Sequence, residues 1–115
     1  MKDLGKKGEA LAVALCKEKG FMVIEQNFRT PFGEIDIIAK DGNIFVFIEV
    51  KARRGDAYGA PFEAVTRHKR EKITKVAMSY MKRFKKEVSA RFDVISISMK
   101  SGNPELEYIQ DAFEV

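Results

Sequence analysis

The spacing of hydrophobic and polar residues changes several times along the chain, and each spacing predicts a different element. Apolar residues recur every three or four positions over 4–19 and 66–84, which predicts two amphipathic helices. Other segments alternate apolar with polar residues or form short apolar runs, which predicts strands over 21–27, 33–39, 44–51, 91–99 and 106–113. The predicted order is α-β-β-β-α-β-β, an α/β fold in which helices flank one sheet.

Length and composition indicate one globular domain spanning 1–115. The chain has 115 residues, of which 45% are hydrophobic and 33% charged. No apolar stretch is long enough to cross a membrane, so we expect no membrane partner and a cytoplasmic location. The single cysteine, Cys16, excludes a disulfide within the chain and is expected to be a small core residue.

Positive charge is concentrated in one segment. Residues 51–91 hold thirteen Lys or Arg and four Asp or Glu, a net charge of +9, whereas the rest of the chain carries −5. A concentrated basic segment favours a face that binds a polyanion such as nucleic acid. The alternative is that these residues form the solvated side of a lysine-rich helix.

The segment KDGN (40–43) predicts a hairpin that brings charged residues together. A two-residue turn at Asp41–Gly42 places Asp36 on the same face as Glu49 and Lys51, because opposed residues and residues two apart share a face. A loop two residues longer puts Asp36 directly opposite Glu49 and leaves the face unchanged. An odd loop length would separate them.

Two carboxylates and a lysine on one face of an apolar sheet suggest metal-assisted chemistry. Unpaired carboxylates in such a place repel each other, and a divalent ion such as Mg²⁺ or Mn²⁺ removes the repulsion. Such an ion can activate water against a phosphodiester, with Lys51 steadying negative charge. The alternative for Glu49 and Lys51 alone is a structural ion pair where the strand emerges into solvent.

Four segments carry a resemblance to a known family: GKKGEALA (5–12), QNFRTPFGEIDIIA (26–39), FVFIEVKARR (45–54) and RFDVISI (91–97). In this order they resemble the small bacterial YraN-like family of predicted nucleases. The arrangement of an Asp, a hairpin and E-x-K is similar to the PD-(D/E)xK superfamily, whose restriction-endonuclease-like core is a mixed sheet flanked by helices. Within it, the chain is similar to the archaeal Holliday-junction resolvases.

The resemblance implies roles for individual residues. Asp36 and Glu49 would be metal ligands, Lys51 catalytic, and Glu9 on the first helix an additional acidic ligand. Ile35 stands where the motif has proline. From the residues alone, Glu9 serves equally well as a first-turn glutamate that favours the helix N-terminus. Because the resolvases act as dimers, the resemblance also implies a homodimer.

The remaining candidates are basic or aromatic. Arg53 and Arg54 follow the E-x-K strand directly and are expected at the rim of the site. Lys69 falls on the inward stripe of the second helix and is expected nearest the site. Arg67, Arg70 and Lys72 join it as candidate phosphate contacts, whereas His68 is expected to be solvated or to face phosphate. Phe32 and Tyr58, in flanking loops, either stack on bases or cover the core.

The sequence therefore predicts a Mg²⁺- or Mn²⁺-dependent endonuclease acting on DNA, which could include branched or recombination intermediates. Two other classes stay open. One is a nucleic-acid-binding module on a nuclease-like scaffold that does not cut, and the other is a protein-interaction adaptor for which the basic segment is incidental.

Overall fold

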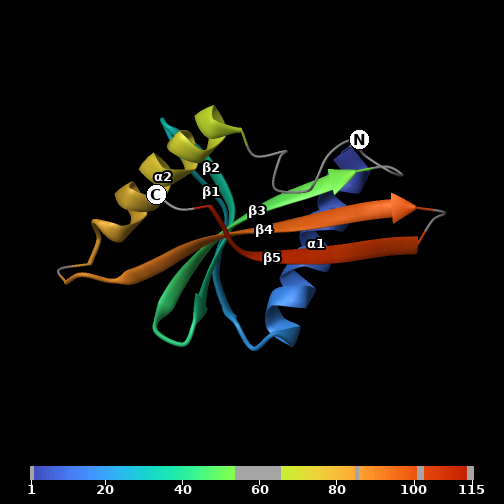
Figure 1. The fold of residues 1–115 in the computed structure, drawn as a ribbon, viewed down its shortest axis with the longest axis horizontal. Coiled ribbons are helices and arrows are strands. Elements are labelled where there is room, and N and C mark those ends of the chain that lie inside the picture. The colour runs from blue at the N-terminus through green and yellow to red at the C-terminus, as the bar shows by residue number, and fades with distance from the viewer. Residues whose placement is uncertain (1, 54–65, 85, 101–102, 114–115) are drawn as a thin grey trace.

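The elements of the chain follow the predicted order. The structure, a computed structural model, describes residues 2–53, 66–84, 86–100 and 103–113. Figure 1 shows their arrangement: α1 (Lys2–Glu18), β1 (Met22–Thr30), β2 (Gly33–Asp41), β3 (Ile44–Arg53), α2 (Arg67–Met81), β4 (Ser89–Lys100) and β5 (Asn103–Phe113). The α/β class and the α-β-β-β-α-β-β order are confirmed. Within these residues no helix has the length and apolar character needed to cross a membrane.

The five strands form one mixed sheet in the order β1-β2-β3-β4-β5. Neighbouring strands are antiparallel except β3 and β4, which run parallel and are joined by the segment that contains α2. A parallel pair needs such a crossover connection, usually through a helix. As predicted from its apolar run, β3 is the central strand.

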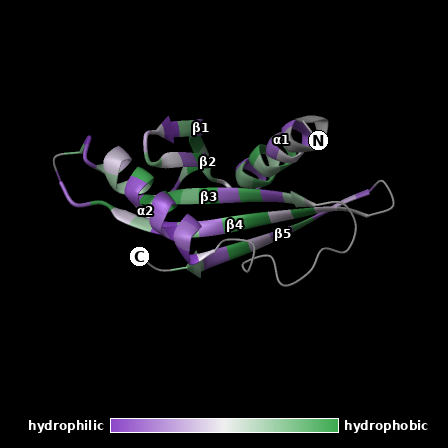
Figure 2. Ribbon diagram, turned by 90° about the horizontal axis from the view of Figure 1, so that it is seen from above, coloured by the Kyte–Doolittle hydropathy of each residue, from purple (hydrophilic) through white to green (hydrophobic). Residues whose placement is uncertain are grey.

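The core consists of two clusters, one on each face of the sheet, and successive side chains of β3 belong to them in turn. Phe45 and Phe47 pack with buried residues of α2, namely Ile73, Val76, Ala77 and Tyr80. Val46 and Ile48 pack in the other cluster with Ala12 and Cys16 of α1. Successive side chains of a strand point to opposite faces, so α1 and α2 cover opposite faces of the sheet. In Figure 2 the first turns of α2 are predominantly hydrophilic, while apolar residues run along the strands.

The C-terminal end of α1 and the N-terminal end of α2 are each fixed by a residue type that suits that position. Gly20, with a φ of 86°, follows α1, and the N–H of Phe21 donates to the carbonyl of Cys16 at 2.9 Å. Glycine allows this left-handed conformation without a steric penalty. Thr66 caps α2, because its side chain accepts a hydrogen bond from the N–H of Lys69 at 3.2 Å. This cap fixes the first turn of α2, which carries Lys69.

The hairpin between β2 and β3 differs from the first prediction by one position. Asp41 pairs with Ile44, so the two turn residues are Gly42 and Asn43 rather than Asp41 and Gly42. Gly42 has a φ of 61°, and a turn with glycine first matches the twist of the flanking strands. The turn keeps the predicted length of two residues but is shifted by one position, and the resulting register brings Asp36 level with Glu49. The shared face was predicted correctly because both registers preserve it.

A buried ionic network on β4, which the sequence analysis did not predict, ties the hairpin to β5. Asp93 is fully buried and accepts hydrogen bonds from Arg91 Nε at 2.9 Å, from the backbone N–H of Asp111 at 2.9 Å and from the Tyr108 hydroxyl. Arg91 also donates to Asp41 Oδ2 at 2.9 Å. A buried charge needs such partners, because desolvation costs several kcal/mol.

We expect Asp93→Ala to lower the free energy of unfolding by about 3–5 kcal/mol, because it leaves the buried Arg91 without its main counter-charge. Urea denaturation measures the change, with the exposed Glu107→Ala on β5 as control. Adding Arg91→Met to Asp93→Ala should recover part of the loss, because the double variant no longer buries an unpaired charge and leaves only the half-exposed Asp41 without its partner. A loss below about 1 kcal/mol for the single variant would contradict the assignment of a stabilising network.

Candidate functional site

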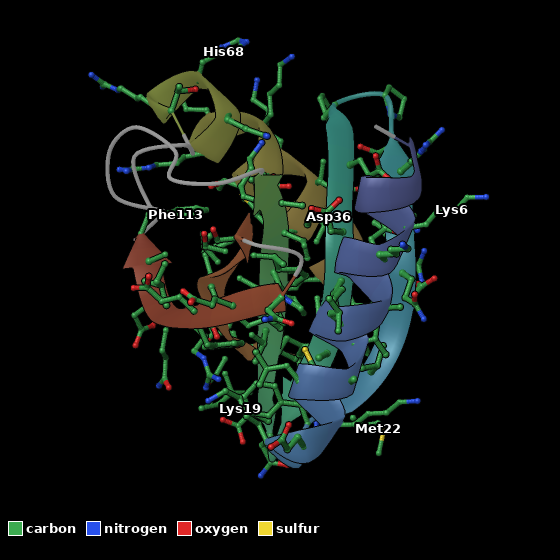
Figure 3. The ribbon with its side chains drawn as sticks, turned by 90° about the vertical axis from the view of Figure 1, so that its right-hand side faces the viewer. Lys6, Lys19, Met22, Asp36, His68 and Phe113 are labelled. Atoms are coloured by element: carbon green, nitrogen blue, oxygen red, sulfur yellow. The ribbon has the colours of Figure 1, made fainter. Side chains whose placement is uncertain are left out.

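The site forms where β2 and β3 separate. Their pairing extends from Asp41 opposite Ile44 to Ile37 opposite Ile48 and stops there. One step further on, the backbone N–H of Val50 donates to Asp36 Oδ2 at 2.7 Å. The Asp36 carboxylate thus satisfies a donor of β3 that no longer has a strand partner on that side. Figure 3 shows Asp36 between the ribbons of β2 and β3.

The neighbouring strand bends at the same level. Asn27 of β1 lies between the paired positions that flank Asp36, and it has a left-handed φ of 53°. Ile35 and Ile37, on either side of Asp36, belong to opposite core clusters. The alternation of the first half of 33–39, which would place Ile35 and Ile37 on one face, therefore does not hold at Asp36. This irregularity lets the Asp36 side chain reach the edge of β3.

Glu49 supplies the second carboxylate. It follows the buried Phe47 on the same face of β3 and is only 9% exposed. Lys69, in the capped first turn of α2, places its Nζ 3.7 Å from Glu49 Oε2. The prediction that Lys69 lies nearest the site among the basic residues of α2 agrees with this contact.

Burial and a second carboxylate raise the pKa of Asp36 to about 8. Desolvation is the largest cause, followed by the hydrogen bond and the charge repulsion with Glu49. The hydrogen bond from Val50 and the positive charge of Lys69 act in the opposite direction but do not cancel the increase. The two carboxyl groups therefore meet, and their proximity and burial favour the protonated form of Asp36 in the metal-free protein.

Lys51 completes the cluster. Burial lowers the pKa of its ammonium, and the hydrogen bond and positive charge of Lys69 lower it further, while Glu49 and Asp36 oppose the decrease. The structure thus brings together Asp36, Glu49, Lys51 and Lys69, which face one another from β2, β3 and α2. A pair of acids and a pair of lysines in one partly buried place can bind a cation through oxygen and an anion through nitrogen.

Glu9 lies with a different set of polar groups. When the nitrogen of the Asn27 amide faces the carboxylates, it donates to Glu9 Oε1 at 2.9 Å and to Glu34 Oε1 at 3.0 Å. Across the part of the chain that the structure describes, no three His, Cys, Asp or Glu side chains are grouped so that they could hold a metal ion. The contact of Asn27 with these two acids was not predicted, and the ligand role of Glu9 stays a prediction.

Among the other basic candidates of α2, Arg67 and Arg70 make different contacts from Lys69. Arg67 pairs with Glu71 at 3.6 Å on the exposed side of α2, and Arg70 places its guanidinium 5.5 Å from the Phe113 ring centroid. Lys72 is exposed, and so is His68, which points away from the sheet in Figure 3. Their phosphate-binding roles stay predictions.

Three candidates fall at or beyond the limit of what the structure describes. Arg53 ends β3, but only its backbone is described. Arg54 and Tyr58 lie outside the described residues.

The two contacts that sequence reasoning missed had no clear signal in the pattern. The Val50 N–H is a backbone group, so no residue type announces that it needs a side-chain partner. Asn27 stands in a predicted strand, and its preference for left-handed conformations is the only sequence feature that could have indicated the bend.

The fold and the site define an α/β protein with a cluster of two carboxylates and two lysines, contributed by β2, β3 and α2, at the end of its central strand. The chain belongs to the family described as Uncharacterised protein family UPF0102, whose model matches residues 8–97. This is the family that the resemblance to YraN-like proteins indicated.

Curated relatives match over nearly the whole chain. It is 50% identical to a UPF0102 protein of Thermodesulfovibrio yellowstonii over 96% of both chains. It is 46% identical to a UPF0102 protein of Syntrophus aciditrophicus, over 96% of this chain and 88% of the relative. It is 45% identical to a UPF0102 protein of Geotalea uraniireducens, over 99% and 91% respectively.

Asp36→Asn should stabilise the metal-free protein increasingly as the pH rises. The folded protein keeps the Asp36 proton up to about pH 8, whereas in the unfolded chain this carboxyl ionises near pH 3.8. Between these values the folded state binds more protons, so the free energy of unfolding declines with rising pH on account of Asp36. Asparagine removes this dependence and can still accept from Val50.

Urea denaturation in EDTA at pH 5 and pH 8.5 tests this expectation. From pH 5 to pH 8.5, the free energy of unfolding of Asp36→Asn should increase by about 1–3 kcal/mol relative to that of the unmodified protein. The exposed Glu105→Gln on β5 serves as control. Equal pH dependence of Asp36→Asn and the unmodified protein would show that Asp36 carries no raised pKa.

Proposed function

We propose that this protein is a Mg²⁺- or Mn²⁺-dependent endonuclease that hydrolyses phosphodiester bonds in DNA. The observation that supports this most strongly is the contact between the Asp36 and Glu49 carboxyls at the end of β3, with Lys51 and Lys69 beside them. Packing gives no reason for two acids to meet at this end of the sheet, because their repulsion costs stability. A binding function for cations and phosphate accounts for all four side chains.

The donor set fits a small divalent ion. Mg²⁺ prefers carboxylate oxygens and keeps several waters, so one or two carboxylates are enough to hold it. Asp36 and Glu49 would provide these oxygens, and the raised pKa of Asp36 reflects the cost of ionising a buried carboxyl beside Glu49, a cost that a bound cation would offset. A bound ion would supply Lewis-acid activation of water and of the phosphoryl group.

The lysines contribute what the acids cannot. Lys51 interacts with both carboxyls, so its ammonium lies where a phosphate oxygen would approach and can stabilise the negative charge that develops during hydrolysis. Lys69 holds the buried Glu49 in place and adds positive charge on the side of α2. Further along the chain, we assign phosphate contacts to Arg53, Arg54, Arg67, Arg70 and Lys72.

The finer parts of the proposal rest on the resemblance to the PD-(D/E)xK superfamily and its resolvases. From it come Glu9 as an additional ligand, branched DNA as a substrate, and action as a homodimer. We also propose a cytoplasmic location, because a DNA substrate would be found there.

One contact favours a second candidate, a nucleic-acid-binding module that does not cut. The ion pair of Lys69 with Glu49 already neutralises one carboxylate without any metal. A protein of this kind would keep the basic surface and use the acids only to position the two lysines.

Purified protein should cleave DNA in the presence of Mg²⁺ or Mn²⁺. The substitutions Asp36→Asn, Glu49→Gln and Lys51→Met should each reduce the cleavage rate at least about a hundredfold, because each removes a charged side chain that would contact the ion or the reacting phosphate. Gel assays on linear and branched DNA measure the rate, and the exposed Lys17→Ala on α1 is the matched control. Cleavage that survives all three substitutions would show that the activity comes from elsewhere. Binding without cleavage would favour the non-cutting module.

Mn²⁺ should stabilise the protein against thermal unfolding at pH 8, by about 2.7 kcal/mol at a concentration one hundred times the dissociation constant. The effect should vanish in Asp36→Asn and Glu49→Gln, because each lacks a ligand oxygen of full charge. A thermal shift titration with Mn²⁺ measures it. Equal stabilisation of the unmodified protein and both variants would place any bound ion outside this site.

A further inference from the structure

An aromatic ring stands in solvent at the turn between β1 and β2. Phe32 is 51% exposed, although phenylalanine is usually buried, and it belongs to neither core cluster. Its backbone N–H donates to Thr30 Oγ1 at 3.1 Å, which helps to fix the turn. Lys75 of α2 places its Nζ 5.8 Å from the ring centroid. The ring is therefore half exposed and lies next to a cation.

A line of lysines along α2 connects this ring with the carboxylates. Lys69, Lys72 and Lys75 are spaced three residues apart, so they lie on neighbouring positions along one side of the helix. Lys69 contacts Glu49 at one end, and Lys75 contacts Phe32 at the other. The helix rises by about 9 Å between these two residues.

The β1–β2 turn lies close to the middle of this line. A Cβ atom built on Gly33 would be 3.8 Å from the Cβ of Lys72 and 3.8 Å from Cγ2 of Val76. Gly33 follows Phe32 directly, so the turn that carries the ring packs beside the lysines of α2, and we call this group of side chains the α2 lysine track. It consists of Phe32, Lys69, Lys72 and Lys75.

The chemistry of the track matches a single-stranded polynucleotide. Lysines in a row can follow a phosphate backbone, and an exposed aromatic ring can stack on a base. A base inside a continuous duplex has both faces covered by its neighbours, so stacking on Phe32 requires an unpaired base. With about 3.4 Å per nucleotide in a stacked strand, the track spans two to three nucleotides.

We propose that the α2 lysine track binds an unpaired strand next to the reacting phosphate, with Lys72 and Lys75 on the backbone and one base stacked on Phe32. The inference rests on the proposed function, because it adds a substrate class to the same site. It assigns the protein a preference for phosphates flanked by unpaired nucleotides over those in continuous duplex.

Binding to fluorescein-labelled DNA in EDTA tests the proposal without cleavage. One probe is a duplex with a gap of three unpaired nucleotides, and the other is the continuous duplex. Phe32→Ala should weaken binding to the gapped probe roughly ten-fold and leave the duplex unaffected, because one stacked base is lost. Phe32→Trp should retain the preference. Met22→Ala, which removes an exposed apolar side chain at the other end of β1, should change neither affinity.

The salt dependence of binding tests the role of the lysines. Lys72→Ala and Lys75→Ala should each reduce the slope of log affinity against log salt concentration for the gapped probe by about 0.7, the value for one lost contact to a single strand. Lys82→Ala, beyond the end of α2, is the matched control. Thermal unfolding of every variant checks that the fold is kept. Unchanged slopes in both lysine variants would overturn the proposed path of the strand.

The outcomes separate this inference from the proposed function. If the protein prefers the gapped probe through Phe32 but never cleaves DNA, the result would support the α2 lysine track and contradict the proposed endonuclease function. Cleavage at equal rates on both probes, with Phe32→Ala neutral in binding, would support the nuclease and overturn the track. The binding experiment is repeated with a gapped probe whose unpaired nucleotides are RNA. The proposal requires that Phe32→Ala weakens binding to the DNA gap, to the RNA gap or to both.

Discussion

The hydrogen bond from the Val50 N–H to Asp36 is the constraint around which this site is organised. Two paired strands that separate leave backbone donors without partners, and an unsatisfied buried donor costs about 1–3 kcal/mol. The Asp36 side chain removes this cost and at the same time is fixed beside Glu49. The same contact therefore ends the β2–β3 pairing and creates the carboxyl pair.

The rest of the sheet supports this arrangement. β3 lies between β2 and β4 and has apolar residues on both faces, so packing holds it on both sides up to the buried Glu49. The parallel pairing of β3 with β4 requires a crossover, and the crossover contains α2, whose capped first turn carries Lys69 to Glu49. At the other end of the sheet, the Asp93 network fixes the hairpin through Asp41. The topology thus provides both the acids and one of the lysines.

The sequence was sufficient for the order of elements and for most of the cluster. An apolar run bounded by turn residues predicted the central strand, and the face shared by Asp36, Glu49 and Lys51 did not depend on the turn position. Lys69 was placed correctly because its spacing from Ile73 is helical. The misses involve contacts between distant segments. Asn27 and Asp93 both occupy ordinary strand positions in the sequence, and only their three-dimensional neighbours give them a role.

The charge balance of the cluster links ion binding to phosphate binding in the proposed function. A proton on Asp36, which its raised pKa favours, reduces the repulsion between the two carboxyls in the metal-free protein, and Lys69 pairs with Glu49. A divalent ion that replaced this proton would add net positive charge where Lys51 and Lys69 already point. A phosphate group would then meet the strongest field at the open end of β3, next to the α2 lysine track. The proton on Asp36 is therefore the natural competitor of the ion, and the same exchange would prepare the site for its anionic substrate.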